Sequence, residues 1–221
     1  MEIHQQLRHQ LKEAAERNRT DGILLSAGLD SSILAILARP RIAFTVALKD
    51  SKAPDVSFAE TVSNLVSIEL KTNRFTQEEA MKALPEVIRI LKTFDLALPN
   101  DLSIYFGFKL AKENDIDSVM TGDGSDELFA GYSYMVSLSP GDLERYIRQL
   151  SKNWHFSADH LGKAMRVEVK QPFLDPDFVR FALDMSQRLK VKEGIGKYIL
   201  RNSFENLIPP EVVWREKEPI E

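Results

Sequence analysis

Cysteine is absent from this sequence of 221 residues. Its absence excludes disulfides, thiolate metal sites and a cysteine nucleophile in this chain. Long apolar runs are missing too, because no stretch approaches the roughly 18 apolar residues that span a membrane. Residues 1–18 are amphipathic and charged, without the apolar core of a signal peptide. We therefore expect a soluble, cytoplasmic protein with no membrane partner.

An excess of positive charge is also lacking. Lysine and arginine number 29 against 33 aspartates and glutamates, so the formal net charge is −4. Duplex nucleic acid attracts basic surfaces, and we therefore expect no nucleic acid partner. Hydrophobic residues make up 43% of the chain, which is enough to bury the core of one ordinary domain. We expect residues 1–221 to form a single domain.

The apolar pattern predicts an α/β fold for the first part of the chain. Strands that alternate with helices indicate a parallel sheet flanked by helices. We expect this arrangement over residues 1–130 and a mainly helical part, without clear strands, over 131–221. Strand-like apolar runs lie at 22–25, 42–48, 67–70 and 117–121, and helical patterns lie at 1–18, 31–38, 55–65, 76–91 and 101–114.

The first motif, Ser26-Ala27-Gly28-Leu29-Asp30-Ser31-Ser32, lies where a predicted strand meets a helix. Small residues let the backbone approach a ligand closely, and the free amides of a helix N-terminus bind anions. The serines add hydroxyl donors. The lysine and spacing of a Walker A loop are missing, so this is a different phosphate-binding loop. The alternative is that Asp30 caps the helix after an ordinary turn.

The second motif, TGDGSDELFAGY at 121–132, follows another predicted strand. Ligands in open α/β sheets bind at the carboxyl ends of strands, so both motifs point into one crevice. Asp30 and Asp126 are then candidate ligands for Mg²⁺, which is usually bound by one or two carboxylates plus substrate phosphates. A helix N-cap is one alternative. A calcium loop is another, although the D-x-[DN]-x-[DN]-G pattern is missing.

These motifs resemble those of a known family. SAGLDSS is similar to the SGGxDS loop of the ATP pyrophosphatases. TGDGSDELFAGY closely resembles the second signature of the asparagine synthetase C-terminal domain and its relative, β-lactam synthetase. PFLD at 172–175 and KYILR at 197–201 resemble two further segments of that group, in the same order. The resemblance runs from about Gly22 to Lys217 and implies the PP-loop ATPase fold, which is adenine nucleotide alpha hydrolase-like.

The resemblance implies a ligase that uses ATP and Mg²⁺. Such an enzyme converts a small carboxylic acid, aspartate in the simplest form, into an acyl-adenylate, releases pyrophosphate and forms an amide with ammonia or another amine. Without the resemblance, Lys197 is interpreted as a solvated helix lysine. Carried over to this sequence, the resemblance implies that the ATP phosphates are bound by Ser26, Gly28, Asp30, Ser31, Ser32 and Lys197. It implies that adenine and ribose contact Leu25, Val46 and Gly122. It also implies that Asp30 and Asp126 bind the metal and that Asp123 is the acid that assists the adenylate step.

The sequence departs from the family pattern at several places. Ala27 stands where the loop usually has glycine, Lys170 stands where the family usually has arginine, and the tail over 214–221 loses a glycine. A lysine cannot replace a bidentate arginine. These departures motivate the alternative of a non-catalytic nucleotide-binding or regulatory protein. A tRNA-modifying member of the wider group is a third hypothesis, which the acidic charge opposes.

The largest departure concerns the nitrogen source. Glutamine-dependent members of the family begin with a glutaminase domain whose nucleophile is an N-terminal cysteine, whereas this sequence starts with Met1-Glu2 and has no cysteine. We therefore expect a synthetase domain without a glutaminase domain. Free ammonia, a separate glutaminase subunit or a different amine, even one within the substrate, is then the nitrogen donor.

Overall fold

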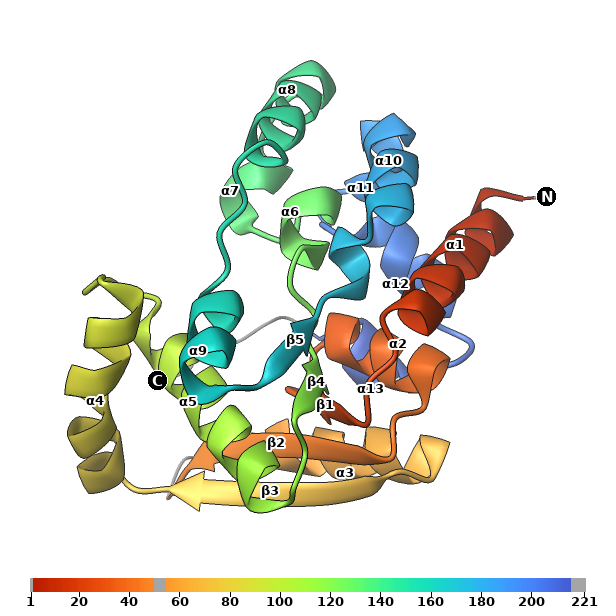
Figure 1. Cartoon of the computed structure of the whole chain (residues 1–221). Coiled ribbons are helices and arrows are strands. Elements are labelled where there is room, and N and C mark those ends of the chain that lie inside the picture. Colours follow the sequence, from red (N-terminus) through yellow and green to blue (C-terminus); the bar gives the residue numbers. More distant parts are fainter. Residues whose placement is uncertain (1, 50–54, 216–221) are drawn as a thin grey trace.

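The fold is built on one parallel sheet. The computed structural model describes residues 2–49 and 55–215, so the altered tail over 216–221 lies outside the described residues. The strand order is β3-β2-β1-β4-β5, and every neighbouring pair is parallel. The predicted parallel α/β fold is therefore confirmed (Figure 1). The strands are β1 (Gly22–Leu24), β2 (Ile42–Leu48), β3 (Glu69–Phe75), β4 (Ser118–Met120) and β5 (Glu168–Lys170).

Helices cover both faces of this sheet. Because side chains alternate along a strand, Ile42 and Phe44 of β2 join one core with α4, α5 and α9, whereas Ala43 joins the other with α1, α2 and α10. Among the described residues, no helix is long and apolar enough to cross a membrane. The helices are α1 (Ile3–Arg17), α2 (Leu29–Ala38), α3 (Asp55–Val66), α4 (Gln77–Leu91), α5 (Leu98–Glu113), α6 (Ser125–Phe129), α7 (Ser133–Val136), α8 (Pro140–Leu150), α9 (Ser157–Met165), the 3-10 helix η1 (Pro172–Leu174), α10 (Pro176–Asp184), α11 (Gln187–Lys190), α12 (Tyr198–Phe204) and α13 (Pro210–Val213).

The expectation of no clear strand beyond residue 131 is wrong. β5 extends the sheet beside β4, with Val169 paired to Val119. It has three residues, Glu168-Val169-Lys170, and none is fully buried. Such a short, polar edge strand has no apolar run for a sequence pattern to reveal. β3 also continues to Phe75, beyond the predicted end at 70, because its mixed polar sequence forms the opposite edge.

The order of the strands creates a switch point. The chain passes outward from β1 to β2 and β3, then crosses back to form β4 on the other side of β1. Ligands in open α/β sheets bind outside the carboxyl ends of the strands at such a point. Both predicted loops follow the two strands concerned, the first after β1 and the second after β4. The fold thus brings the loops together.

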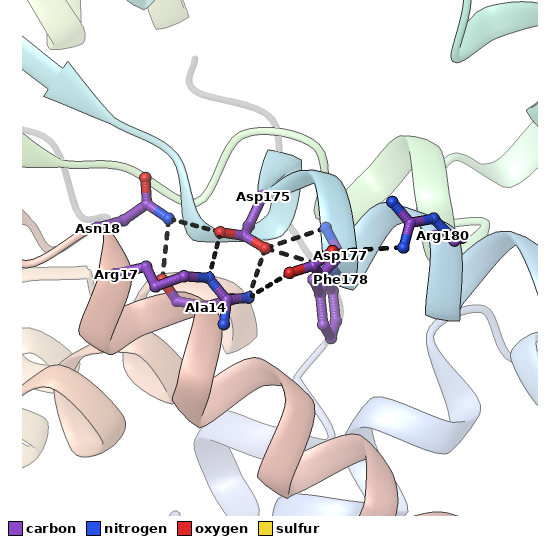
Figure 2. Close-up of polar contacts among 7 residues, drawn as sticks. All are labelled: Ala14, Arg17, Asn18, Asp175, Asp177, Phe178 and Arg180. Atoms are coloured by element: carbon purple, nitrogen blue, oxygen red, sulfur yellow. Dashed lines mark hydrogen bonds and ion pairs between the residues drawn. The ribbon is translucent and has the colours of Figure 1, made fainter.

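The PFLD-like segment anchors the N-terminal helix. Asp175 caps α10 by accepting hydrogen bonds from the amides of Asp177 and Phe178, at 3.1 and 3.4 Å. The same carboxylate accepts two hydrogen bonds from Arg17, at 2.9 Å from Nε and 2.6 Å from Nη2. Asn18 approaches it too, at 3.3 Å. Figure 2 shows the end of α1 held in this way against the segment that follows β5.

We expect Asp175→Ala to lower the free energy of unfolding by about 2 kcal/mol, because a helix cap is lost together with the ion pair between the buried Asp175 carboxylate and the more exposed Arg17. Urea unfolding at neutral pH measures this. The hydrogen bonds from Arg17 lower the pKa of Asp175 below its ordinary value. The stabilisation is therefore present above pH of about 4 and is lost as the pH falls through the pKa of the folded state. Asp177→Ala is the control, because Asp177 is exposed. We expect this change to lower the free energy of unfolding by less than half as much as Asp175→Ala.

Lys190 is a buried lysine whose side chain lies against Phe129 of α6. It is 0% exposed, and its Nζ lies 5.7 Å from the ring centroid of Phe129. Among the described residues, this Nζ has no hydrogen-bond partner. Burial, with a contribution from the nearby Arg148 and against an opposing one from Glu144, lowers the pKa of Lys190 from 10.5 to about 7. Folding therefore favours its neutral form.

This pKa predicts a pH dependence of stability. Between about pH 7 and 10.5 the unfolded chain binds the Lys190 proton more tightly than the folded one, so stability rises with pH in that window. We expect urea unfolding to give about 2 kcal/mol more stability at pH 9 than at pH 7 from this group. Lys190→Met should remove that increment. An equal pH dependence in the variant would show that the lysine stays charged in the fold.

Candidate active site

A cavity of about 700 Å³ lies at the carboxyl ends of β1, β2 and β4. Its walls also include the start of α5 and the segment at the start of α9. Two predicted site residues, Ser32 and Lys197, do not line it. Ser32 is fully buried, and its hydroxyl has no hydrogen-bond partner within the described part of the chain. The predicted residues that line the cavity are Leu25, Ser26, Gly28, Asp30, Ser31, Val46, Gly122, Asp123 and Asp126.

The first loop turns sharply between β1 and α2. Ala27 has φ of 53°, in the left-handed region, and is fully buried. Glycine adopts this conformation without strain, whereas alanine does so at a small cost. The chain still makes the turn, and Gly28 is the N-cap residue of α2. The first amides of α2 have no acceptor within the helix, so this end of the cavity offers donors for an anion.

Hydroxyl groups reinforce this loop. The Ser26 and Ser31 hydroxyl oxygens lie 3.2 Å apart, and the Ser31 hydroxyl donates to the carbonyl of Gly28 at 3.3 Å. Both serines line the cavity. An anion at the start of α2 would therefore meet hydroxyl donors as well as amides.

Asp30 connects the first loop to the second. The alternative that it caps α2 is wrong, because Gly28 is the N-cap residue and no side chain caps that end. The Asp30 side chain instead accepts a hydrogen bond from the Ser125 hydroxyl at 2.6 Å. Its other oxygen lies 2.6 Å from the ammonium group of Lys197. The plain helix-cap interpretation of the second motif is wrong as well, since Gly124 is the N-cap residue of α6 and no side chain caps that end.

Lys197 lies between two carboxylates. Its Nζ is 2.6 Å from Asp30 Oδ2 and 2.7 Å from Asp126 Oδ1, and the residue is 5% exposed. Its interpretation as a solvated helix lysine is therefore wrong. Burial lowers the pKa of Lys197, but the two carboxylates outweigh this effect and raise it above its ordinary value. The group is a buried, permanently charged cation at neutral pH.

Glycines allow the charged groups to come this close. A Cβ on Gly122 would lie 3.1 Å from Cβ of Asp30. A Cβ on Gly131 would lie 1.8 Å from Asp126 Oδ1 and 2.5 Å from Lys197 Cε. No side chain fits at the second position without displacing the ion pair. The glycines of the GDGSDELFAGY motif therefore allow this segment to approach Asp30 and Lys197 closely.

The donor set suits a magnesium ion bound together with phosphates. Asp30 Oδ2 and Asp126 Oδ1 converge on one positive centre, at present the ammonium of Lys197. Within the described ranges, no group of three or more histidine, cysteine, aspartate or glutamate side chains could hold a metal ion. Two carboxylates leave the remaining positions of an octahedral ion to phosphate and water oxygens. Calcium, which takes about 6–8 oxygen ligands, is less well served.

Asp123 is held by side chains from two strand ends. Its Oδ2 accepts hydrogen bonds from the hydroxyl of Thr121 at 2.7 Å and from the amide of Gln171 at 3.0 Å. Thr121 follows β4 and Gln171 follows β5. The contribution of Gln171 was not predicted, because β5 itself was not. The carboxylate is fixed at the wall of the cavity beside the two loops.

Glu127 and Tyr132 are further cavity residues that sequence reasoning did not single out. The Tyr132 hydroxyl donates to Glu127 Oε1 at 2.6 Å. Burial raises the pKa of Glu127, and burial also raises that of Tyr132. Both residues belong to the GDGSDELFAGY motif, so the motif carried the signal for them. They form a hydrogen-bonded pair on the wall next to Asp126.

Comparison with known proteins identifies the family. The model of the family described as asparagine synthase matches residues 2–157 and 141–221. The chain belongs to the asparagine synthase family. The glutamine-hydrolyzing asparagine synthetase of Mus musculus is 34% identical over 94% of this chain, and that of Homo sapiens is 35% identical over 94%. This chain spans 40% of the length of each.

A search of solved structures gives a more distant neighbour. A U34-tRNA thiolase, NcsA from Methanococcus maripaludis, is 15% identical, with a TM-score of 0.47 over 95% of this chain and 75% of the other. The family assignment depends on the sequence matches. The residues matched to the asparagine synthase family include both loops and the segment that carries Lys197.

Proposed function

We propose that this chain is an ATP-dependent ligase of the asparagine synthase family. It activates a carboxylic acid, aspartate in the simplest form, as an acyl-adenylate with release of pyrophosphate, and then forms an amide with ammonia or another amine. The supporting observation is the convergence of Asp30, Asp126 and Lys197 where the two strand-end loops meet beside one cavity.

The two loops are suited to bind ATP. The amides at the start of α2, with the hydroxyls of Ser26 and Ser31, would bind phosphate oxygens. Adenine and ribose would lie against Leu25, Val46 and Gly122. Asp30 and Asp126 would hold Mg²⁺, which when bound neutralises charge on the phosphates. ATP and Mg²⁺ are thus proposed ligands of this site.

The reaction needs fixed positive charge. A carboxylate oxygen of the acid attacks the α-phosphorus, and the bond from that phosphorus to the pyrophosphate oxygen breaks. Negative charge grows on the departing group, and the cation of Lys197 stabilises it. The amine then attacks the acyl carbon, and AMP leaves with the oxygen that came from the acid. Asp123 would take up the proton that the amine loses.

The absence of cysteine is the basis for our proposal about the nitrogen donor. The relatives are named as glutamine-hydrolyzing, but this chain has no cysteine and cannot use a cysteine nucleophile of its own. We propose that ammonia or another amine enters directly, or that a separate glutaminase subunit supplies ammonia. Activity with ammonium salts and no glutamine would show that ammonia is accepted, whether it enters freely or from a glutaminase subunit, whereas no activity would indicate a different amine.

ATP–pyrophosphate exchange tests the proposed activation step. Labelled pyrophosphate should enter ATP when aspartate and Mg²⁺ are present. Asp126→Asn should lower the exchange rate by about 100-fold, whereas Asp117→Asn, which removes an exposed carboxylate outside the cavity, should leave it unchanged. A panel of other acids follows if aspartate fails. ATP binding without exchange for any acid would instead support the non-catalytic nucleotide-binding alternative.

A further inference from the structure

Gln171 lies between two carboxylates at the end of β5. Its side-chain nitrogen donates to Asp123 Oδ2 at 3.0 Å. Burial raises the pKa of Asp159 in α9, and a hydrogen bond with the Gln171 side chain opposes this effect. An ionised carboxylate only accepts hydrogen bonds, whereas an amide nitrogen carries two N–H donors. The nitrogen of the Gln171 amide therefore faces both carboxylates.

The end of the sheet fixes the point from which the Gln171 side chain extends. The amide of Thr121 donates to the carbonyl of Lys170 at 2.9 Å, so the chain leaves β4 and β5 side by side. Gln171 is the N-cap residue of η1, and its carbonyl accepts a hydrogen bond from the amide of Leu174 at 2.8 Å. The backbone at Gln171 is thus held on both sides, and its side chain reaches Asp123 from a fixed origin.

A neutral side chain contacts Asp123 at this place. Lys170, the residue before Gln171, is paired with Glu168, at 2.8 Å from Nζ to Oε1. A cation in the place of the Gln171 amide would stabilise the ionised form of Asp123 and so weaken it as a base. The amide of Gln171 orients the carboxylate without cancelling its charge.

Two donors hold the Asp123 carboxylate through one oxygen. Oδ2 accepts hydrogen bonds from the Thr121 hydroxyl at 2.7 Å and from the Gln171 amide at 3.0 Å. Like charges lie close by, since burial raises the pKa of Glu127 and the charges of Asp126 and Asp123 raise it further. Hydrogen bonds to the ionised form of a carboxyl group favour that form. The two donors therefore favour an ionised Asp123 in one orientation, as a general base requires.

We propose that Gln171 is a positioning residue for the amide-forming step, in which it holds Asp123 ready to take up the proton of the attacking amine. In that step the bond from the nitrogen to the acyl carbon forms, the bond from that carbon to the AMP oxygen breaks, and one proton passes from the nitrogen to Asp123. The activation step needs no such transfer, because the acid attacks as a carboxylate. Gln171 does not line the cavity, so it acts through Asp123. This proposal rests on the proposed function and assigns a residue to its second step.

Gln171→Leu removes both N–H donors with little change in volume. ATP–pyrophosphate exchange with aspartate measures the activation step. Rapid quenching after the amine, beginning with ammonium, is added to the preformed acyl-adenylate measures the second step. Exchange should stay within about 2-fold of the natural sequence, whereas the rate of amide formation should fall by about 10-fold, as the loss of one hydrogen bond to a charged group implies. Gln171→Glu keeps the shape, loses the donors and adds a like charge, so it should lower that rate at least as far.

Two comparisons separate positioning from a structural role. Gln149→Leu, at an exposed position of α8 outside the cavity, is the matched control and should alter neither rate. In the Asp123→Asn background, Gln171→Leu should lower the rate of amide formation by no more than about 2-fold, because no base is left to position. A structural role predicts the same loss in both backgrounds. Circular dichroism and urea unfolding show that each variant is folded.

Two results would overturn the role of Gln171. The first is a rate of amide formation in Gln171→Leu that is unchanged or that falls equally with exchange. The second is an undiminished loss in the Asp123→Asn background. Failure of the proposed function is distinct, since no acid would then support exchange in the natural sequence. NMR of the Gln171 side-chain amide, assigned by its loss in Gln171→Leu, decides in that case. Its signals should shift in Asp123→Asn and not in Asp184→Asn at the exposed end of α10, and unchanged signals in Asp123→Asn would overturn the contact.

Discussion

Lys197→Met is expected to lower kcat for ATP–pyrophosphate exchange by at least about 100-fold. The same change should lower the free energy of unfolding by about 3 kcal/mol, because two carboxylates lose the buried cation between them. Both effects follow from the distances of 2.6 and 2.7 Å from Nζ to Asp30 and Asp126, and from an exposure of 5%. Exchange kinetics and urea unfolding measure them on the same sample.

Controls separate the structural effect of Lys197 from its chemical one. Lys192→Met removes a nearby lysine that contacts Tyr198 instead, and it should alter neither quantity by much. Converting Asp30 and Asp126 to asparagine in the Lys197→Met background should restore most of the stability, since no unpaired charge then remains, yet restore no activity. Full activity in Lys197→Met would contradict the role proposed for this cation.

Gly131→Ala is expected to have the second-largest effect. The added Cβ would lie 1.8 Å from Asp126 Oδ1 and 2.5 Å from Lys197 Cε, so the ion pair must move. We expect a loss of about 3 kcal/mol in the free energy of unfolding, at the upper end for an overpacked site. Exchange should fall by about 100-fold or more as the charged groups leave their positions. Thermal or urea unfolding and exchange kinetics check the two values.

Gly141→Ala is the matched control for the glycine. Gly141 lies in the first turn of α8, and an added Cβ there would meet nothing within 4 Å. Alanine is a better helix former than glycine, so stability should stay unchanged or rise by up to about 1 kcal/mol. If Gly131→Ala is as stable and active as Gly141→Ala, the segment 122–131 does not approach Lys197 as closely as described.

The central part of the fold is predictable from sequence for a physical reason. β1, β2 and β4 lie inside the sheet, so their apolar residues form continuous runs that a pattern reveals. The loops that follow β1 and β4 contain small and acidic residues in a recognisable order. β5 escapes prediction because it is a short edge strand whose side chains are partly exposed. Its sequence signal is as weak as that of a polar loop.

Sequence reasoning predicted which residues belong to the site better than it predicted how those residues are arranged. Ser31 and Ser32 are adjacent in sequence, but successive helix positions are rotated by about 100°, so Ser31 lines the cavity and Ser32 faces the core. Lys197 meets Asp30 across 167 positions of sequence. Without the family resemblance, no local pattern distinguishes it from a surface lysine.

Transfer of an oxygen atom from the acid to AMP tests the proposed activation step most directly. Aspartate labelled with ¹⁸O in its carboxylates is incubated with the full chain, ATP, Mg²⁺ and ammonium. Because the acid oxygen that attacks the α-phosphorus stays with AMP, mass spectrometry should find one labelled oxygen in its phosphate group. AMP without label, or ADP and phosphate as products, would contradict an acyl-adenylate.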